Sequence, residues 1–403
     1  MISARAAAAH QPAPAKARTP HHQPELDGIR GLAILAVLLS HAAGILGVLP
    51  HRMPHPAWTP IAAFVLVPGW GGVDLFFTLS GFLITGILLR ARKRPTYFRP
   101  FYARRVLRIF PIYYLFLTVT LIAGHIWLRF GEQLPAGTAA RVSYFLYLQN
   151  WPVFWPNWVG LTSIWGSFWS LAVEEQFYLV WPTIVRLLSM RTMLGICAFG
   201  FALGIPLRYF LIQHFTGISG GIIHFPLSRL DGLFVGAACA LYREQRGRPV
   251  PLRWAAVSFT AGAAMFGFIA VFHVREMVGL GMHICTFGIT AYALMAGGLV
   301  AASQHPVARL QKILTLRPLL LAGRYSYGMY VYHLVIYLGF EALARRISPA
   351  TNGEFTFFPA LGYMAIAVLA TTAFAAFSFH FFEKKFLEMK RFFPSPAAPV
   401  AAS

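Results

Sequence analysis

The chain has 403 residues, of which 57% are hydrophobic and 12% are charged, and its mean hydropathy is +0.60. This composition is too apolar for a soluble domain of that length. The net charge of +21 does not indicate nucleic-acid binding, because the basic residues cluster in short loops between apolar runs and no separate basic domain is left over. The recurring apolar runs predict an all-α, polytopic membrane helix bundle with about ten transmembrane helices.

Most of the expected spans are close to the ~20 residues that cross the hydrocarbon core of a bilayer. In chain order, their approximate bounds are 29–49, 66–89, 109–128, 167–187, 193–213, 226–242, 254–274, 277–301, 319–340 and 357–380. With the N-terminus in the cytoplasm, most of the 34 Lys and Arg residues fall in cytoplasmic loops, and a minority that includes Arg208 falls on the outer side. This asymmetry predicts that both termini are cytoplasmic.

The stretch 142–165 interrupts this series of spans. It is apolar and aromatic but contains four Trp and two Pro residues. Counting it as a span would invert the orientation of every later loop. We therefore expect an interfacial or re-entrant segment on the outer face.

The two ends of the chain differ in composition from the body. Residues 1–24 are rich in Ala, Pro and His and predict a disordered cytoplasmic tail, without the apolar region of a signal peptide. We expect residues 25–391 to form the membrane domain and residues 392–403 a second cytoplasmic tail, with no further soluble domain. The three Cys residues lie in apolar runs without metal-ligand spacing, so no metal site is expected.

Ionisable residues inside membrane spans are costly and are therefore functional candidates. Arg30 and His41, in the first span, are eleven residues apart. At ~100° per residue they share one helix face and are separated by ~16 Å along the axis. An arginine at the cytoplasmic surface suits a phosphate, and a histidine near the middle of the bilayer suits proton transfer. The alternative is a snorkelling arginine with a histidine that is hydrogen-bonded inside the bundle.

A second basic group lies at the expected start of the third span. Arg105 and Arg108 are spaced i, i+3 and share a helix face. Two guanidinium groups in this position are suited to hold a phosphorylated cofactor from the cytoplasm. Contact with anionic lipid explains the same pattern equally well.

Two adjacent acidic residues, Glu174 and Glu175, lie in the outer part of the fourth expected span. Adjacent helix positions diverge by ~100°, which argues against one shared role. One of them is expected to face a substrate cavity, and the other to pair with an arginine or to keep its proton. A purely structural buried pair is the alternative.

The remaining candidates have strong structural alternatives. Asp74 begins the helical part of the second span, where an N-cap role also explains it. Arg229 is close to Asp231, and a local charge network between them is the favoured interpretation. Tyr330 and His333 share one helix face, and a hydrogen-bonded core histidine is the more common case for such a His. We treat Asp74, Arg229, Tyr330 and His333 as substrate-binding or supporting candidates.

Six stretches together resemble the acyltransferase-3 family of integral-membrane acyltransferases. Their order and spacing fit that family over about residues 25–340. The stretches are ELDGIRGLAILAVLLSHA, GVDLFFTLSGFLIT, YARRVLRIFPIYY, SFWSLAVEEQFYLVWP, LSRLDGLFVGAACAL and GRYSYGMYVYHLV.

The resemblance implies transfer of an acyl group, often acetyl, from cytoplasmic acyl-CoA to a hydroxyl of an extracytoplasmic glycan, glycolipid or glycoside. The family's Arg-x10-His motif corresponds to Arg30 and His41, and its Arg-x-x-Arg motif corresponds to Arg105 and Arg108. His41 would act as general base or carry the acyl group. Glu174 or Glu175 would orient the acceptor or the histidine.

The resemblance also implies a bacterial inner-membrane protein that uses acyl-CoA, most simply acetyl-CoA, as a donor substrate and holds no permanent cofactor and no metal. Some relatives carry an appended extracytoplasmic esterase-like domain, and the chain is expected to resemble the stand-alone form. The acyl chain, the acceptor and the oligomeric state are left open by the sequence.

A proton-coupled secondary transporter or polysaccharide exporter is the alternative from a different class, because intramembrane His and Glu residues also suit proton coupling. The absence of an inverted repeat and the presence of a basic pair beside the Arg30–His41 face favour the acyltransferase.

Overall fold

The computed structural model describes residues 23–45, 67–126, 134–151, 163–214, 224–273, 281–347 and 357–394. These ranges are helical and contain no strand. Seven of their helices are long and apolar enough to cross a membrane, so the prediction of an all-α, multi-pass membrane protein is confirmed. Each predicted span overlaps a helix, whereas the number of ten crossings and the cytoplasmic location of both termini stay predictions. The expected tails lie almost wholly outside the described residues.

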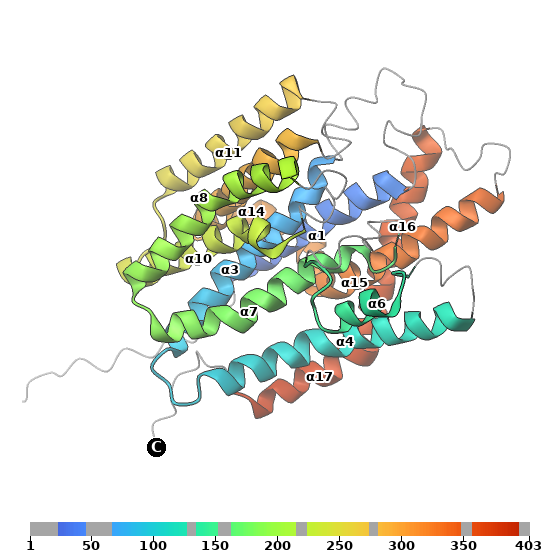
Figure 1. Cartoon of the computed structure of the whole chain (residues 1–403), viewed down its shortest axis with the longest axis horizontal. Helices are drawn as coiled ribbons and strands as arrows, with labels where there is room; N and C mark the ends of the chain where they lie inside the picture. Colours follow the sequence, from blue (N-terminus) through green and yellow to red (C-terminus); the bar gives the residue numbers. More distant parts are fainter. Residues whose placement is uncertain are drawn as a thin grey trace, which may run out of the picture.

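The α-helices are numbered as in Figure 1. They are α1 (Pro24–Ile45), α3 (Gly72–Ala91), α4 (Phe98–Ile126), α6 (Thr138–Phe145), α7 (Trp169–Leu187), α8 (Met190–His214), α10 (Leu230–Arg246), α11 (Leu252–Phe272), α13 (Ile289–Ala302), α14 (Ala308–Leu314), α15 (Arg317–Ile347), α16 (Phe357–Ser378) and α17 (Lys384–Glu388). Short 3₁₀ or π segments are η2 (Val67–Gly71), η5 (Gly166–Phe168), η6 (Pro226–Arg229), η7 (Ile284–Gly288), η9 (Phe379–Glu383) and η10 (Met389–Phe392).

Helices α1 and α3 lie between α8, α10 and α11 on one side and α4 and α17 on the other (Figure 1). α1 packs mainly on α15, and α3 packs mainly on α10. Glycines permit both close approaches, because a Cβ on Gly31 would lie 1.9 Å from the Leu319 carbonyl oxygen and one on Gly81 would lie 2.0 Å from that of Leu233. Small residues are the usual device for bringing membrane helices this close.

Helix α4 begins earlier than predicted. The expected span began at residue 109, but the helix begins at Phe98, so Arg105 and Arg108 lie inside it rather than at its start. Pro111, which follows these arginines, does not end the helix, because it is accommodated within it. The two guanidinium groups are thereby held on a continuous helical surface instead of a loop.

The aromatic stretch 142–165 packs against the C-terminal half of α4. The Tyr113 hydroxyl donates to the Tyr144 carbonyl oxygen at 2.8 Å, and the Trp165 indole donates to the Thr120 hydroxyl at 2.8 Å. Its helical part, α6, is eight residues long and too short to span a bilayer. Residues 152–162 of the stretch lie outside the described residues.

Arg229 and Asp231 belong to a buried charge network, as expected, but each pairs with a residue of another helix rather than with the other. A carboxylate oxygen of Asp74 in α3 lies 3.1 Å from Arg229, and Asp231 in α10 binds Arg208 in α8 at 2.8 Å. Arg208, which the charge count placed on the outer side, has no exposed surface. These buried ion pairs link α3 to η6 and α8 to α10, and they compensate charges that would be costly alone.

Candidate active site

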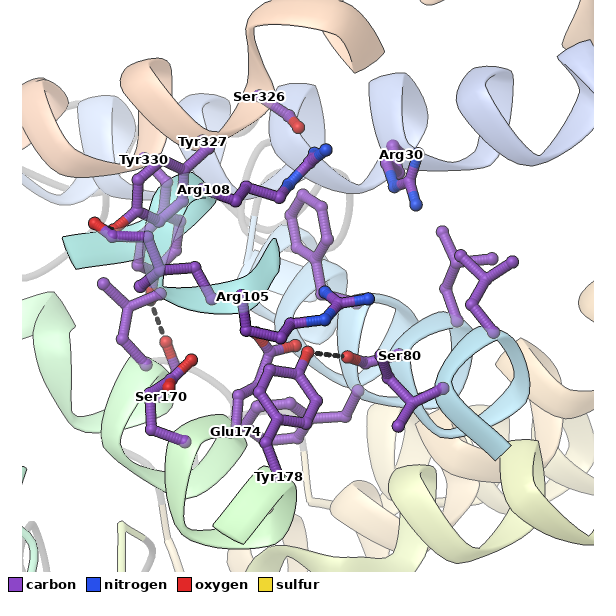
Figure 2. A pocket seen from close by; sticks show the side chains of 18 of the residues that line it. Arg30, Ser80, Arg105, Arg108, Ser170, Glu174, Tyr178, Ser326, Tyr327 and Tyr330 are labelled. Carbon is purple, nitrogen blue, oxygen red and sulfur yellow. Dashed lines mark hydrogen bonds between the residues drawn. The ribbon is translucent and has the colours of Figure 1, made fainter. Parts of the chain in front are cut away.

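A cavity of about 120 Å³ lies between α1, α3, α4, α7 and α15. It brings together residues that are far apart in the sequence, and Figure 2 shows their side chains converging from these helices. Its polar lining consists of Arg30, Ser80, Arg105, Arg108, Ser170, Glu174, Glu175, Tyr178, Ser326, Tyr327 and Tyr330. Six of the predicted site residues, the three arginines, the two glutamates and Tyr330, therefore share one cavity.

Two of the three cavity arginines are not neutralised by a direct salt bridge. Arg30 binds Asp27 at 2.6 Å. Within the described residues, neither Arg105 nor Arg108 forms a salt bridge, and the Arg105 guanidinium lies 5.2 Å from the centre of the Tyr178 ring. Unpaired guanidinium groups that face a cavity are suited to bind an anion such as a phosphate.

Arg104, the neighbour of this pair, has a different task. It donates to the carbonyl oxygens of Lys390 and Phe393 at 3.1 and 2.9 Å, and so fixes the end of η10 against α4. The i, i+3 spacing therefore separates the cavity arginines from a structural one on the same helix.

Glu174 and Glu175 both line the cavity, although only one was expected to do so. The Glu174 carboxyl lies close to the hydroxyls of Ser80 and Tyr178, and these two hydroxyls hydrogen-bond each other (Figure 2). Glu175 has no hydrogen bond within the described residues, and it interacts electrostatically with Glu174 and Arg105. The two glutamates thus differ in partners but share a location with the arginines.

Ser80, Ser170 and Tyr178 were missed as site residues, although a signal for two of them was present. Ser170, Glu174 and Tyr178 follow one another at intervals of four residues on α7, which places them on one helix face. Ser80 lies on α3, and no pattern in the sequence connects it to that face. Only the packing of α3 against α7 brings Ser80 to Glu174.

Tyr330 forms a hydrogen-bonded wall of the cavity with Ser170. The Tyr330 hydroxyl donates to the Ser167 carbonyl oxygen at 2.8 Å and lies 2.5 Å from the Ser170 hydroxyl oxygen. The backbone carbonyl of Tyr330 contacts Nδ1 of His333 at 2.7 Å. Tyr330 therefore connects the cavity to the histidines.

His41 does not line the cavity and instead pairs with His333. Nδ1 of His41 lies 2.8 Å from Nε2 of His333, and the two rings are nearly parallel, with an interplanar angle of 7° and centroids 5.0 Å apart. His333 has no exposed surface, whereas His41 is partly exposed. The hydrogen bonds of the described residues thus give His41 a histidine partner, and neither glutamate, one of which was expected to orient His41, takes that place.

Asp74 and Arg229 lie behind the cavity rather than in it. The Arg229 guanidinium lies 5.8 Å from the centre of the Phe77 ring, and Phe77 lines the cavity. It also contacts the rings of Trp70 and Trp169, at 5.8 and 5.1 Å. This geometry supports a role in holding the cavity wall and gives neither residue direct access to a ligand there.

The fold and the site define a polytopic membrane protein with a basic cavity and a nearby histidine pair. The model of the acyltransferase-3 family, described as an acyltransferase domain, matches residues 23–379. The chain therefore belongs to this family of acyltransferases, and the resemblance seen in the sequence is confirmed.

Two of the curated relatives that the chain resembles are named O-acetyltransferases. The chain is 28% identical to the peptidoglycan O-acetyltransferase OatA of Listeria monocytogenes, over 89% of this chain and 55% of that protein. It is 26% identical to the O-acetyltransferase OatA of Staphylococcus aureus, over 80% of this chain and 51% of that protein. The chain thus spans about half the length of the curated relatives it matches. No solved structure matches the chain.

Proposed function

We propose that the chain is an O-acyltransferase that moves an acyl group, most simply acetyl, from cytoplasmic acyl-CoA to a hydroxyl of an extracytoplasmic cell-envelope glycan. The relatives' names support acetyl transfer to such an acceptor. The observation that carries the donor assignment is the cavity in which Arg30, Arg105 and Arg108 converge from two helices.

The donor fits the cavity by charge. Coenzyme A carries a pyrophosphate and a 3′-phosphate, and guanidinium groups bind such oxygens through paired, charge-assisted hydrogen bonds. Arg105 and Arg108 have no salt bridge to lose on binding, within the described residues. The neutral pantetheine arm then extends along the cavity towards Tyr330, the lining residue that contacts His333.

His41 carries the chemistry in this proposal. It accepts the proton of the acceptor hydroxyl while that oxygen attacks the thioester carbonyl carbon. The C–S bond breaks, and the departing CoA thiolate takes up the proton from His41. In the covalent variant, a nitrogen of His41 attacks the thioester carbonyl carbon, the C–S bond breaks and CoA leaves as the thiolate. The acceptor oxygen then attacks the acyl carbon, the N–C bond breaks, and the acceptor's proton neutralises the thiolate.

The glutamates contribute to the donor end of the cavity. Glu174 lies beside the hydroxyls of Ser80 and Tyr178, and the Arg105 guanidinium lies against the Tyr178 ring. This arrangement supports a positioning role for Glu174, because it fixes the surface on which the Arg105 guanidinium rests.

The test is acyl transfer by the purified full chain, supplied with labelled acetyl-CoA and cell-envelope glycan. We expect His41→Ala to abolish label transfer at equal folded yield. His125→Ala is the matched control, because His125 is exposed and, among the residues that the structure describes, bonds only to a carbonyl of its own helix. Transfer that is unaffected by His41→Ala would refute the mechanism, and a chain that neither binds CoA nor transfers label would favour a transporter.

A further inference from the structure

The hydrogen bonds of the His41–His333 pair have a defined direction from donor to acceptor. A hydrogen-bonded chain runs from the Tyr330 carbonyl oxygen to Nδ1 of His333 at 2.7 Å, and from Nε2 of His333 to Nδ1 of His41 at 2.8 Å. Three nitrogens and one oxygen are thus used, and only Nε2 of His41 has no hydrogen-bond partner within the described residues. The protonation states of both histidines follow from the one group in this series of hydrogen bonds whose role cannot change.

That group is the backbone carbonyl, which can only accept a hydrogen bond. Nδ1 of His333 must therefore carry the proton that it donates to Tyr330. In a neutral His333, Nε2 is then unprotonated and accepts. Nδ1 of His41 must donate to it, which leaves Nε2 of His41 as a free lone pair.

The opposite direction requires a charged His333, and its surroundings argue against this. His333 has no exposed surface, and its ring neighbours are His41, Tyr330 and Tyr337. Within the described residues, no carboxylate forms a salt bridge with it. A buried cation without a counter-charge is strongly disfavoured, so the neutral pair is the resting state.

We infer that His333 is a positioning residue that selects the tautomer of His41 and makes Nε2 its reactive nitrogen. The inference rests on the proposed function, in which His41 takes up a proton or an acyl group. When Nε2 of His41 takes up a proton, the ring becomes an imidazolium. Its Nδ1–H bond to His333 then becomes charge-assisted and stronger, so the same contact also stabilises the charged state.

The arrangement has a clear chemical consequence. In serine hydrolases a carboxylate fixes the tautomer of the catalytic histidine, and here a second neutral imidazole occupies the equivalent place. A neutral acceptor adds no charge to the membrane interior, where a carboxylate without a cation is costly. A backbone carbonyl of α15 sets the direction, so the selection does not depend on another titrating group.

Two substitutions separate positioning from packing. His333→Gln keeps a side-chain carbonyl oxygen that can accept from His41, whereas His333→Leu keeps the bulk and removes the acceptor. We expect His333→Leu to lower kcat for acyl transfer roughly 10- to 100-fold, the usual cost of removing an orienting partner. His333→Gln should recover most of this loss, and both variants should bind CoA as tightly as the wild type. Tyr337→Phe, beside His333, is the packing control.

Nitrogen-15 NMR of the full chain reads the tautomer without any assay of activity. The signals of His41, one of 14 histidines, are identified as those lost in a His41→Asn variant. We expect a protonated Nδ1 and an unprotonated Nε2 in the wild type, and a mixture of tautomers in His333→Leu. A wild-type His41 protonated on Nε2 would overturn the inference even if the chain transferred no label. Equal loss of kcat in His333→Leu and His333→Gln would also overturn it, because that result indicates packing alone.

Discussion

Arg108→Gln offers the sharpest test of the donor site. Arg108 lines the cavity and, within the described residues, forms no salt bridge. Its removal therefore breaks no direct salt bridge, although Arg108 also interacts electrostatically with Glu383. Arg30 is less suitable, because its substitution would also release Asp27 from a 2.6 Å ion pair.

The expected magnitude follows from the kind of bond that is lost. A hydrogen bond to a charged group contributes about 1.5–3 kcal/mol, and each 1.4 kcal/mol corresponds to a tenfold change in Kd. We therefore expect Arg108→Gln to weaken CoA binding by roughly 10- to 100-fold. Pantetheine, which lacks the phosphates, should bind the variant and the wild type equally.

Calorimetric titration of the detergent-purified chain measures these constants. Arg99→Gln is the matched control, because Arg99 is an exposed arginine of the same helix that does not line the cavity. A second titration with 3′-dephospho-CoA shows whether Arg108 contacts that phosphate, since the two losses are then not additive. A folded Arg108→Gln protein that binds CoA as tightly as the wild type would refute the donor assignment.

Three further substitutions test the structure around the cavity. Arg208→Leu should destabilise the protein by about 3–5 kcal/mol, because it leaves the buried Asp231 carboxylate without its salt bridge. Thermal unfolding in detergent measures the loss of stability, and an unchanged Tm would contradict the prediction. Gly31→Ala should lower the Tm and the folded yield, because the new Cβ would lie 1.9 Å from a carbonyl oxygen of α15. Gly195→Ala is the control and should lower neither, because its Cβ would meet no atom within 4 Å. Equal effects of the two substitutions would show that α1 and α15 are less closely packed. Glu174→Gln should strengthen CoA binding a few-fold, because it keeps the size of the side chain and removes an acid that competes with the donor phosphates for Arg105. Weaker binding would show that the carboxyl group itself organises the site.

Helical periodicity correctly predicted which candidate residues share a helix. Arg30 and His41 lie on one continuous helix, as do Arg105 and Arg108. The apolar runs also located the helices, because the length of a span is set by the thickness of the bilayer. Both signals depend only on residues that are close together in the chain.

The contacts between helices could not be predicted in the same way. His41 was expected to meet the thioester with help from a glutamate, yet its partner is His333, which lies 292 residues further along the chain. Asp231 was expected to pair with the neighbouring Arg229, but the packing of α8 on α10 brings Arg208 to it instead. Several helices here carry compensating charges, and spacing within one helix does not identify which of them will be neighbours.

The separation of the arginine cavity from the histidine pair is consistent with the physical problem that the proposed reaction poses. The phosphates of CoA are highly charged, and moving them into a membrane interior is costly. A donor held by Arg105 and Arg108 would keep its charges at one end of the cavity, while only its neutral arm and the acyl group extend towards Tyr330. His41 lies beyond that wall in a neutral pair, so it can act on the acyl group without contacting the phosphates. In the proposed reaction, the acyl group on the donor arm must therefore reach the histidine pair at the wall formed by Tyr330 and Ser170.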